Sequence, residues 1–178
     1  MQGIPLNERK RLGALLDDRP QTEVMAMIPQ FSQAETDNFV APPAQIPEAL
    51  GVLMFNMERG VNLPEIQEFL RDCPDIQPFD VILANELDDG CARSGNKNTA
   101  RELAQAFGLN YAWGLEFIEL VNDENAKGFH GNAVFSRWPI RRAGVIRLPE
   151  QYNWYFDRQK RIGGRLAVFA ELDVGGQP

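Results

Sequence analysis

Two polar side chains follow the two most apolar runs of the chain. Asn56 comes directly after Val52–Phe55, and Glu86 comes shortly after Val81–Ala84. A carboxylate next to a buried run is costly unless it is paired, hydrogen-bonded or bound to a metal. A neutral amide beside it can orient the carboxylate without adding charge. Such a pair suits a hard divalent cation, whose remaining ligands are waters and substrate oxygens. The alternative is that both residues only cap strand ends.

A third polar segment covers residues 128–137, with the sequence GFHGNAVFSR. Its two glycines allow a tight turn before a strand and present His130 and Asn132 near the start of that strand. His130 is the only histidine of the chain, and a purely structural role is the alternative for it. Arg93 belongs to a polar loop after the Glu86 strand, which either lines the same crevice or only connects two elements.

The elements that must position these residues are those of a layered α/β protein. Continuous apolar runs predict strands that are covered on both faces at 52–55 and 81–84. Further strands are predicted at 111–113, 116–120, 132–136 and 166–172, helices at 62–70 and 98–107, and a loop over 139–160. The second helix carries a Thr99–Glu102 capping box and ends at Gly108. Strands interleaved with helices imply a mixed sheet packed against helices.

The first 47 residues are expected to form a separate N-terminal extension. A short helix is predicted over 7–16, and the prolines at 29, 42 and 43 favour an irregular tether over 21–45. Residues 48–178 then form one domain, since 178 residues leave little room for two.

Charge is distributed unevenly along the chain. Residues 1–126 carry 9 basic and 21 acidic side chains, whereas residues 127–165 carry 9 basic and 2 acidic ones. An acidic part followed by a basic one suits a site that joins a cation to a phosphate, and a patchily charged solvated surface is the alternative. Two cysteines make no disulfide framework, no run is long enough to span a membrane, and no secretory signal is visible. A cytoplasmic location is therefore expected.

Four segments in order resemble landmarks of the endonuclease/exonuclease/phosphatase superfamily. Residues 52–60 (VLMFNMERG) resemble its first motif, a strand that ends in the Asn of a WN or FN pair. Residues 80–88 (DVILANELD) resemble its second motif, with Asn85 in place of the usual Gln before the metal-binding Glu. Residues 128–139 resemble its GNAxxSRxPI strand. Residues 158–171 resemble a turn rich in Arg and Gly that leads into a central strand. The match covers the N-terminal half of the family's domain.

The resemblance implies a fold and a chemistry. The family's fold is a four-layered α/β sandwich of the DNase I-like type, and its members hydrolyse phosphate esters with Mg²⁺ or Mn²⁺. Carried over by motif, Glu86 and Asn56 would hold the metal, and Asn56, Glu86 and His130 would form the catalytic set. Asn132 and Arg93 would contact the substrate. Phe129 stands where several relatives have Tyr, so one phosphate-contacting hydroxyl is missing.

The family's second set of catalytic motifs does not occur in this sequence. Asn-Thr-His, Asp-x-Asn and Asp-His motifs would follow the last strand, and the chain ends without them. The complete domain is expected to be a phosphodiesterase, nuclease or phosphatase, and the truncated chain is expected to have negligible turnover. Its substrate is a nucleic acid, a phospholipid head group or a small phosphoester. No protein partner is indicated. The alternative is a catalytically silent relative that acts as a binding or interaction module.

Overall fold

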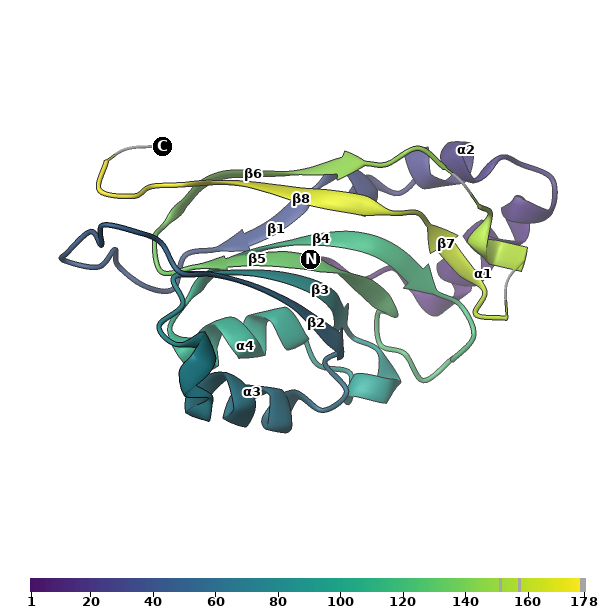
Figure 1. Ribbon diagram of the computed structural model, residues 1–178. Helices are drawn as coiled ribbons and strands as arrows, with labels where there is room; N and C mark the ends of the chain where they lie inside the picture. Colours follow the sequence, from purple (N-terminus) through teal and green to yellow (C-terminus); the bar gives the residue numbers. More distant parts are fainter. Residues whose placement is uncertain (151, 157, 177–178) are drawn as a thin grey trace.

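The computed structural model describes residues 1–150, 152–156 and 158–176 (Figure 1). A six-stranded sheet has the order β1-β4-β5-β3-β2, with β7 also paired to β4, and a second sheet consists of β6 and β8. The strands are β1 Ala34–Asp37, β2 Val52–Arg59, β3 Val81–Asp89, β4 Asn110–Glu119, β5 Phe129–Ser136, β6 Ile140–Arg147, β7 Arg161–Gly163 and β8 Leu166–Leu172. The helices are α1 Leu6–Ala14, α2 Gln21–Ala26, α3 Leu63–Asp72 and α4 Thr99–Phe107, with 3-10 turns η1 Leu15–Asp17, η2 Pro29–Ser32, η3 Pro74–Ile76, η4 Ala92–Ser94 and η5 Trp154–Phe156.

The six-stranded sheet lies between a helical layer and the smaller sheet. Helices α3 and α4 cover one face, and β6 and β8 lie over the other (Figure 1). Strands β2 and β3 run parallel, and the remaining pairs in the sheet are antiparallel. These facts confirm the prediction of an α/β fold with a mixed sheet and flanking helices.

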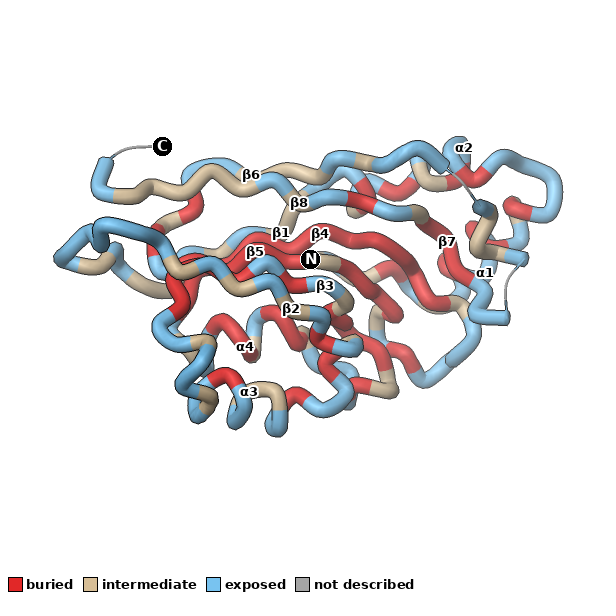
Figure 2. Tube along the Cα trace, viewed as in Figure 1, coloured by how far each residue is buried: buried red, intermediate tan, exposed pale blue. Residues whose placement is uncertain are grey.

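Strand β2 forms one edge of the sheet and corrects one prediction. Phe55 stacks on Phe69 of α3 at 5.7 Å between ring centroids, so this side of the strand is covered. Val52 and Met54 alternate with Phe55 onto the other side, where Met54 is 74% exposed. Most of the β2 trace is accordingly exposed or intermediate (Figure 2). The prediction that this run is covered on both faces is therefore wrong, because β6 and β8 lie mainly over β4 and β5. We call the uncovered side of β2 and β3 the open face.

The segment before residue 47 contributes packed elements. Strand β1 pairs with β4, with Ala34 opposite Gly114, and Val24 and Phe31 join the main hydrophobic core. The helix predicted over 7–16 is present as α1. The irregular tether expected over 21–45 is wrong for α2, η2 and β1, because the apolar residues of this segment find partners in the core. The division into an extension (1–47) and a domain (48–178) stays a prediction. Residues 151, 157 and 177–178 of that domain lie outside the described part of the chain.

Two further local predictions need correction. The 139–160 segment contains strand β6, whereas a loop was expected there. The N-cap of α4 is Asn98, whose Oδ1 accepts a hydrogen bond from the Arg101 backbone N–H at 2.9 Å. Thr99 instead donates its hydroxyl to the Asp88 carbonyl, so the capping box is wrong. Gly108 ends the helix in the left-handed conformation, as predicted.

Candidate functional site

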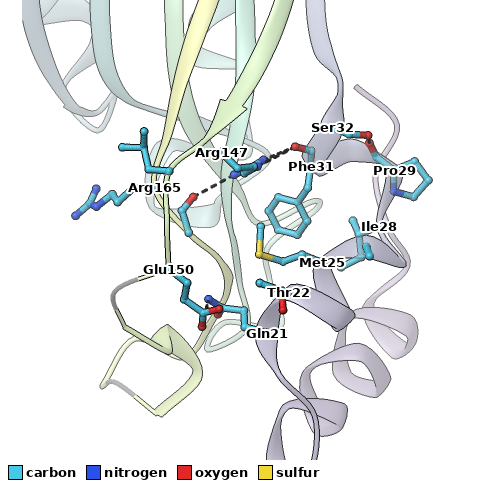
Figure 3. A pocket seen from close by; sticks show the side chains of 13 residues that line it. Gln21, Thr22, Met25, Ile28, Pro29, Phe31, Ser32, Arg147, Glu150 and Arg165 are labelled. Carbon is cyan, nitrogen blue, oxygen red and sulfur yellow. Dashed lines mark hydrogen bonds between the residues drawn. The ribbon is translucent and has the colours of Figure 1, made fainter.

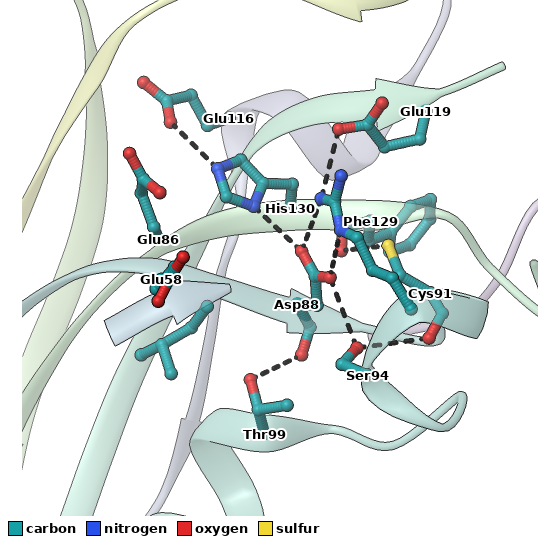
Figure 4. Close-up of polar contacts among 12 residues, drawn as sticks. Glu58, Glu86, Asp88, Cys91, Ser94, Thr99, Glu116, Glu119, Phe129 and His130 are labelled. Carbon is teal, nitrogen blue, oxygen red and sulfur yellow. Dashed lines mark hydrogen bonds and ion pairs between the residues drawn. The ribbon is translucent and has the colours of Figure 1, made fainter. Parts of the chain in front are cut away.

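The candidate site lies at an irregularity in the pairing of β2 with β3. The two strands stay in register as far as Asn56 opposite Asn85, and the pairing then shifts before Leu87. Within this irregular stretch Glu58 has φ 46° and Glu86 has φ 59°. Left-handed backbone is uncommon for residues other than glycine, and it occurs most often at turns and sites of function. The irregularity interrupts the alternation of side chains and turns Glu86 toward Glu116 and His130 (Figure 4).

Glu86 is held through its backbone, and its carboxylate is free. Its N–H donates to Oδ1 of Asn132 on β5 at 3.1 Å. Within the described residues, the Glu86 carboxylate has neither a hydrogen bond nor an ion pair. Asn56 is exposed on the open face, and its Oδ1 accepts a hydrogen bond from the Glu58 N–H at 2.9 Å. The irregular stretch of β2 and β3 therefore presents an unpaired carboxylate beside neutral amide groups.

A buried ionic network lies next to this irregular stretch and is centred on Asp88. This fully buried carboxylate accepts hydrogen bonds from Arg93 Nε at 2.7 Å and Nη2 at 2.8 Å, and from the Ser94 hydroxyl at 3.2 Å. His130 Nδ1 lies 2.8 Å from Asp88 Oδ1 (Figure 4). Because Asp88 and His130 are direct partners on β3 and β5, the sheet itself sets this contact.

The other ring nitrogen of His130 faces a second buried carboxylate. Its Nε2 lies 3.9 Å from Glu116 Oε2, which has no hydrogen-bond partner within the described residues. The other carboxylate oxygen of Glu116 accepts a hydrogen bond from Arg165 at 3.1 Å. Phe117 stacks on the imidazole with 6.3 Å between ring centroids. The imidazole is therefore fixed in orientation by Asp88 and Phe117.

Charges in this network stabilise one another against the cost of burial. Burial alone would raise the pKa of Asp88, but hydrogen bonds from Arg93 and His130 outweigh it and leave that pKa below its ordinary value. Burial acts to lower the pKa of Arg93, and Asp88 more than reverses this effect. Cys91 nearby has its thiol pKa raised by burial and by Asp88, so the thiol is protonated and unreactive.

The structure brings several of the predicted site residues together. The Glu86 backbone contacts Asn132 directly, and the Glu86 side chain points to the side of the sheet on which His130 lies (Figure 4). Asn56 lies on the neighbouring strand, opposite Asn85. The Arg93 guanidinium binds Asp88 and, at 3.1 Å, Glu119, so it is engaged in this network. The roles given to these residues stay predictions.

Sequence reasoning missed four members of the network, namely Asp88, Glu116, Glu119 and Arg165. A signal for one of them was present, because Glu116 interrupts the apolar run of β4 and is only 1% exposed. A charge inside an apolar strand requires a partner. Its partner Arg165 lies 49 residues away, and no local pattern joins the two.

Two kinds of feature are absent from the described residues. No group of three or more His, Cys, Asp and Glu side chains is arranged there to hold a metal ion. In the same part of the chain, no helix is both long and apolar enough to cross a membrane.

Comparison with known proteins adds one similarity. No family model and no curated protein matches the chain. Among solved structures, the chain is similar to the crystal structure of an endonuclease/exonuclease/phosphatase from Beutenbergia cavernae DSM 12333, with a TM-score of 0.49 and 21% sequence identity. The similarity covers 70% of this chain and 34% of that one. The chain thus spans about a third of the length of the structure it matches.

Proposed function

We propose that this chain carries one flank of a metal-dependent phosphoester hydrolase site, with Glu86 as the carboxylate ligand of Mg²⁺ or Mn²⁺. The observation that carries the proposal is the unpaired Glu86 carboxylate in the irregular stretch of β3, oriented through the Asn132 hydrogen bond to its backbone. Motif resemblance at residues 52–60, 80–88 and 128–139 points to the same chemistry.

The donors present fit such a cation. Mg²⁺ binds oxygen ligands, keeps several waters and often takes only one or two protein carboxylates. Glu86 supplies one carboxylate, and Asn56 supplies an amide on the neighbouring strand β2. Glu58 adds a second carboxylate whose oxygens have no partner within the described residues. A metal bound there would polarise a phosphoryl oxygen and lower the pKa of a bound water.

The chain's own residues have separate tasks in this proposal. Asn132 fixes the backbone of Glu86, and Asn56 orients the phosphate beside it. His130 has its Nδ1 occupied by Asp88, so only Nε2 is available to exchange a proton or a hydrogen bond with a substrate oxygen. The substrate class is a phosphate ester, taken from nucleic acids, phospholipid head groups or small phosphoesters. Activity belongs to the complete domain in this proposal.

Metal binding by the chain tests the assignment of Glu86. Mn²⁺ is titrated into the wild type and into Glu86→Gln, with free Mn²⁺ followed by electron paramagnetic resonance. We expect the substitution to weaken binding roughly tenfold or more, as the loss of metal-site groups commonly does. The matched control is Glu65→Gln, an exposed position in the first turn of α3, which should bind like the wild type.

Hydrolysis tests the reaction itself. The complete domain is assayed with bis-p-nitrophenyl phosphate and Mg²⁺ or Mn²⁺, with and without Glu86→Gln. We expect activity that depends on the metal and is lost in the variant. Mn²⁺ binding that is unaffected by Glu86→Gln would overturn the metal assignment. Metal binding without any hydrolysis by the complete domain would favour the silent binding module.

A further inference from the structure

A pocket of about 200 Å³ lies between the segment that follows β6 and the turn that precedes β8. The two walls are tied together, because the Leu148 N–H donates to the Arg165 carbonyl at 3.0 Å. Two aromatic side chains, Tyr152 and Trp154, and two charged ones, Glu150 and Arg165, line the pocket. Pockets for drug-sized ligands measure about 300–1,000 Å³, so this smaller one suits a single ring system.

The aromatic part of the pocket is anchored in the core and reaches solvent. Trp154 packs edge-on against Phe117, which is fully buried, with 5.2 Å between ring centroids. Tyr152 packs edge-on against Trp154 at 5.1 Å and is 49% exposed. The two rings therefore form a fixed aromatic surface that a flat ligand can reach. Aromatic side chains presented in this way are the surfaces on which proteins stack nucleic-acid bases.

Arg165 adds a cation to this aromatic surface. Its guanidinium lies 5.2 Å from the Trp154 ring centroid and 5.6 Å from that of Phe117. Nη1 donates to Glu116 at 3.1 Å, which fixes one edge of the group. The side chain is 54% exposed, and in Figure 3, which shows an adjoining pocket beside α2, it extends away from Arg147. Because the described residues offer no partner to Nε and Nη2, these donors are open to a ligand.

Glu150 supplies the opposite kind of group. It is exposed, and its Oε1 accepts a hydrogen bond from Gln21 Nε2 at 3.2 Å. Its Oε2 has no partner within the described part of the chain. The pocket therefore combines a stacking surface with an open acceptor and open donors. A ligand that satisfies all three is flat and carries both an N–H donor and an acceptor on its edge.

A nucleobase meets these requirements, because its ring has a π-face and its edge carries donors and acceptors side by side. An aliphatic ligand would gain no stacking and would leave Glu150 and Arg165 without partners. The pocket also belongs to the basic part of the chain, since residues 127–165 carry 9 basic and 2 acidic side chains. We propose that this pocket binds the base of a nucleotide or of a single-stranded nucleic acid. A base inside a duplex is stacked and cannot enter it.

Arg165 joins the pocket to the candidate site. It holds Glu116, whose other oxygen lies 3.9 Å from His130 Nε2. Among the substrates of the proposed function, the pocket therefore selects phosphate esters that carry a base. This selection rests on the proposed function, whereas binding of the base does not, since none of the residues assigned to the hydrolysis lines the pocket.

Tryptophan signals report on this pocket directly. The chain has 3 tryptophans, of which Trp113 and Trp138 are 1% exposed and Trp154 lines the pocket. The full chain is labelled with 5-fluorotryptophan and titrated with each of the four ribonucleoside 5′-monophosphates, followed by ¹⁹F NMR. Ribose 5-phosphate is the matched probe without a base. We expect a saturable shift of the Trp154 signal with at least one nucleotide and none with ribose 5-phosphate.

A pair of variants tests the stacking surface. Tyr152→Leu removes the exposed ring, and we expect it to weaken binding of the tightest nucleotide roughly tenfold. The matched control is Phe156→Leu, which makes the same kind of change at a 64% exposed ring outside the pocket and should bind like the wild type. A single-stranded pentadeoxynucleotide of the same base identifies the source: tighter binding than the nucleotide assigns the pocket to nucleic acid, and equal binding assigns it to free nucleotides.

Two outcomes would overturn the proposal. One is a Trp154 signal that no nucleotide shifts, or that ribose 5-phosphate shifts equally. The other is a Tyr152→Leu variant that binds as tightly as Phe156→Leu. Failure of the hydrolase assignment is distinguishable, because Glu86→Gln should leave the Trp154 titration unchanged. Base binding without hydrolysis by the complete domain would leave the pocket assignment standing, and hydrolysis without base binding would refute it alone.

Discussion

Replacement of Asp88 by asparagine tests the buried network at its centre. The carboxylate is fully buried and receives hydrogen bonds from Arg93, Ser94 and His130. An asparagine keeps the shape but loses the charge, and its NH₂ group turns two donors toward groups that are themselves donors. Neutralising one partner of a buried ion pair costs about 3–5 kcal/mol, because the other charge is left uncompensated.

The structure places the expected loss at the lower end of this range. Arg93 keeps its contact with Glu119 at 3.1 Å, and its side chain is 27% exposed, so solvent and a second carboxylate still stabilise the guanidinium. We therefore expect Asp88→Asn to lower the free energy of unfolding by about 3 kcal/mol. For a chain of this length, that corresponds to a fall in Tm of roughly 6–12 °C.

Urea unfolding followed by tryptophan fluorescence measures this loss, since Trp113 and Trp138 are buried. The matched control is Asp123→Asn, because Asp123 pairs with Lys10 at 2.5 Å on the surface, where both side chains are more than half exposed. Exposed pairs contribute about 0–1 kcal/mol. An Asp88→Asn variant as stable as the Asp123→Asn control would refute the view that Asp88 organises a buried charge network.

Two more predictions concern the pH dependence and the packing of the same region. Hydrogen bonds hold the folded-state pKa of Asp88 below its unfolded value of about 3.9. Ionised Asp88 therefore contributes its full stabilisation at pH values above the unfolded-state pKa. This contribution is lost as the pH falls through the lower, folded-state pKa. The stability difference between wild type and Asp88→Asn should shrink in this acid window, and a difference independent of pH would contradict the assignment. In Gly131→Ala, the new Cβ would lie 2.0 Å from the Gly114 carbonyl oxygen and 2.8 Å from the Trp113 ring, so we expect a loss of about 3 kcal/mol in urea unfolding. In the control Gly144→Ala, the new Cβ meets nothing within 4 Å, so stability should change by less than about 0.5 kcal/mol. An equal loss in both variants would show that the contact of the new Cβ at residue 131 with the Gly114 carbonyl is not the cause of the loss.

The sequence predicted the parts of the fold where local pattern and burial agree. Strands β3 and β8 and helices α3 and α4 follow from apolar runs and helical periodicity. Strand β1 could not be predicted, because its residues Ala34–Asp37 show no alternation of apolar and polar side chains. Only its backbone pairing with the distant strand β4 makes it a strand. Strand β6 was missed because the arginines of IRRAGVIR, two of them adjacent at Arg141 and Arg142, break the alternation of apolar and polar residues that marks a strand.

The candidate site was predictable in its outline and not in its electrostatics. Asn56 and Glu86 stood out because polar residues follow apolar runs. The structure continues β2 to Arg59 and β3 to Asp89, so the two residues lie within neighbouring strands and not at their ends. The ion pairs of Glu116 with Arg165 and of Arg93 with Glu119 join residues far apart in sequence. Such pairs depend on the tertiary arrangement of the sheet, so each charge on its own was indistinguishable from a solvated one.

The position of β1 has a consequence for how the protein folds during its synthesis. Ala34 is opposite Gly114 in the sheet, and these residues are 80 positions apart. Translation proceeds at about 5–20 residues per second, so the β1 segment waits roughly 4–16 s for its partner strand to be made. During that interval α1, α2 and β1 lack the core that holds them. The N-terminal segment is thus made first and acquires its structure late.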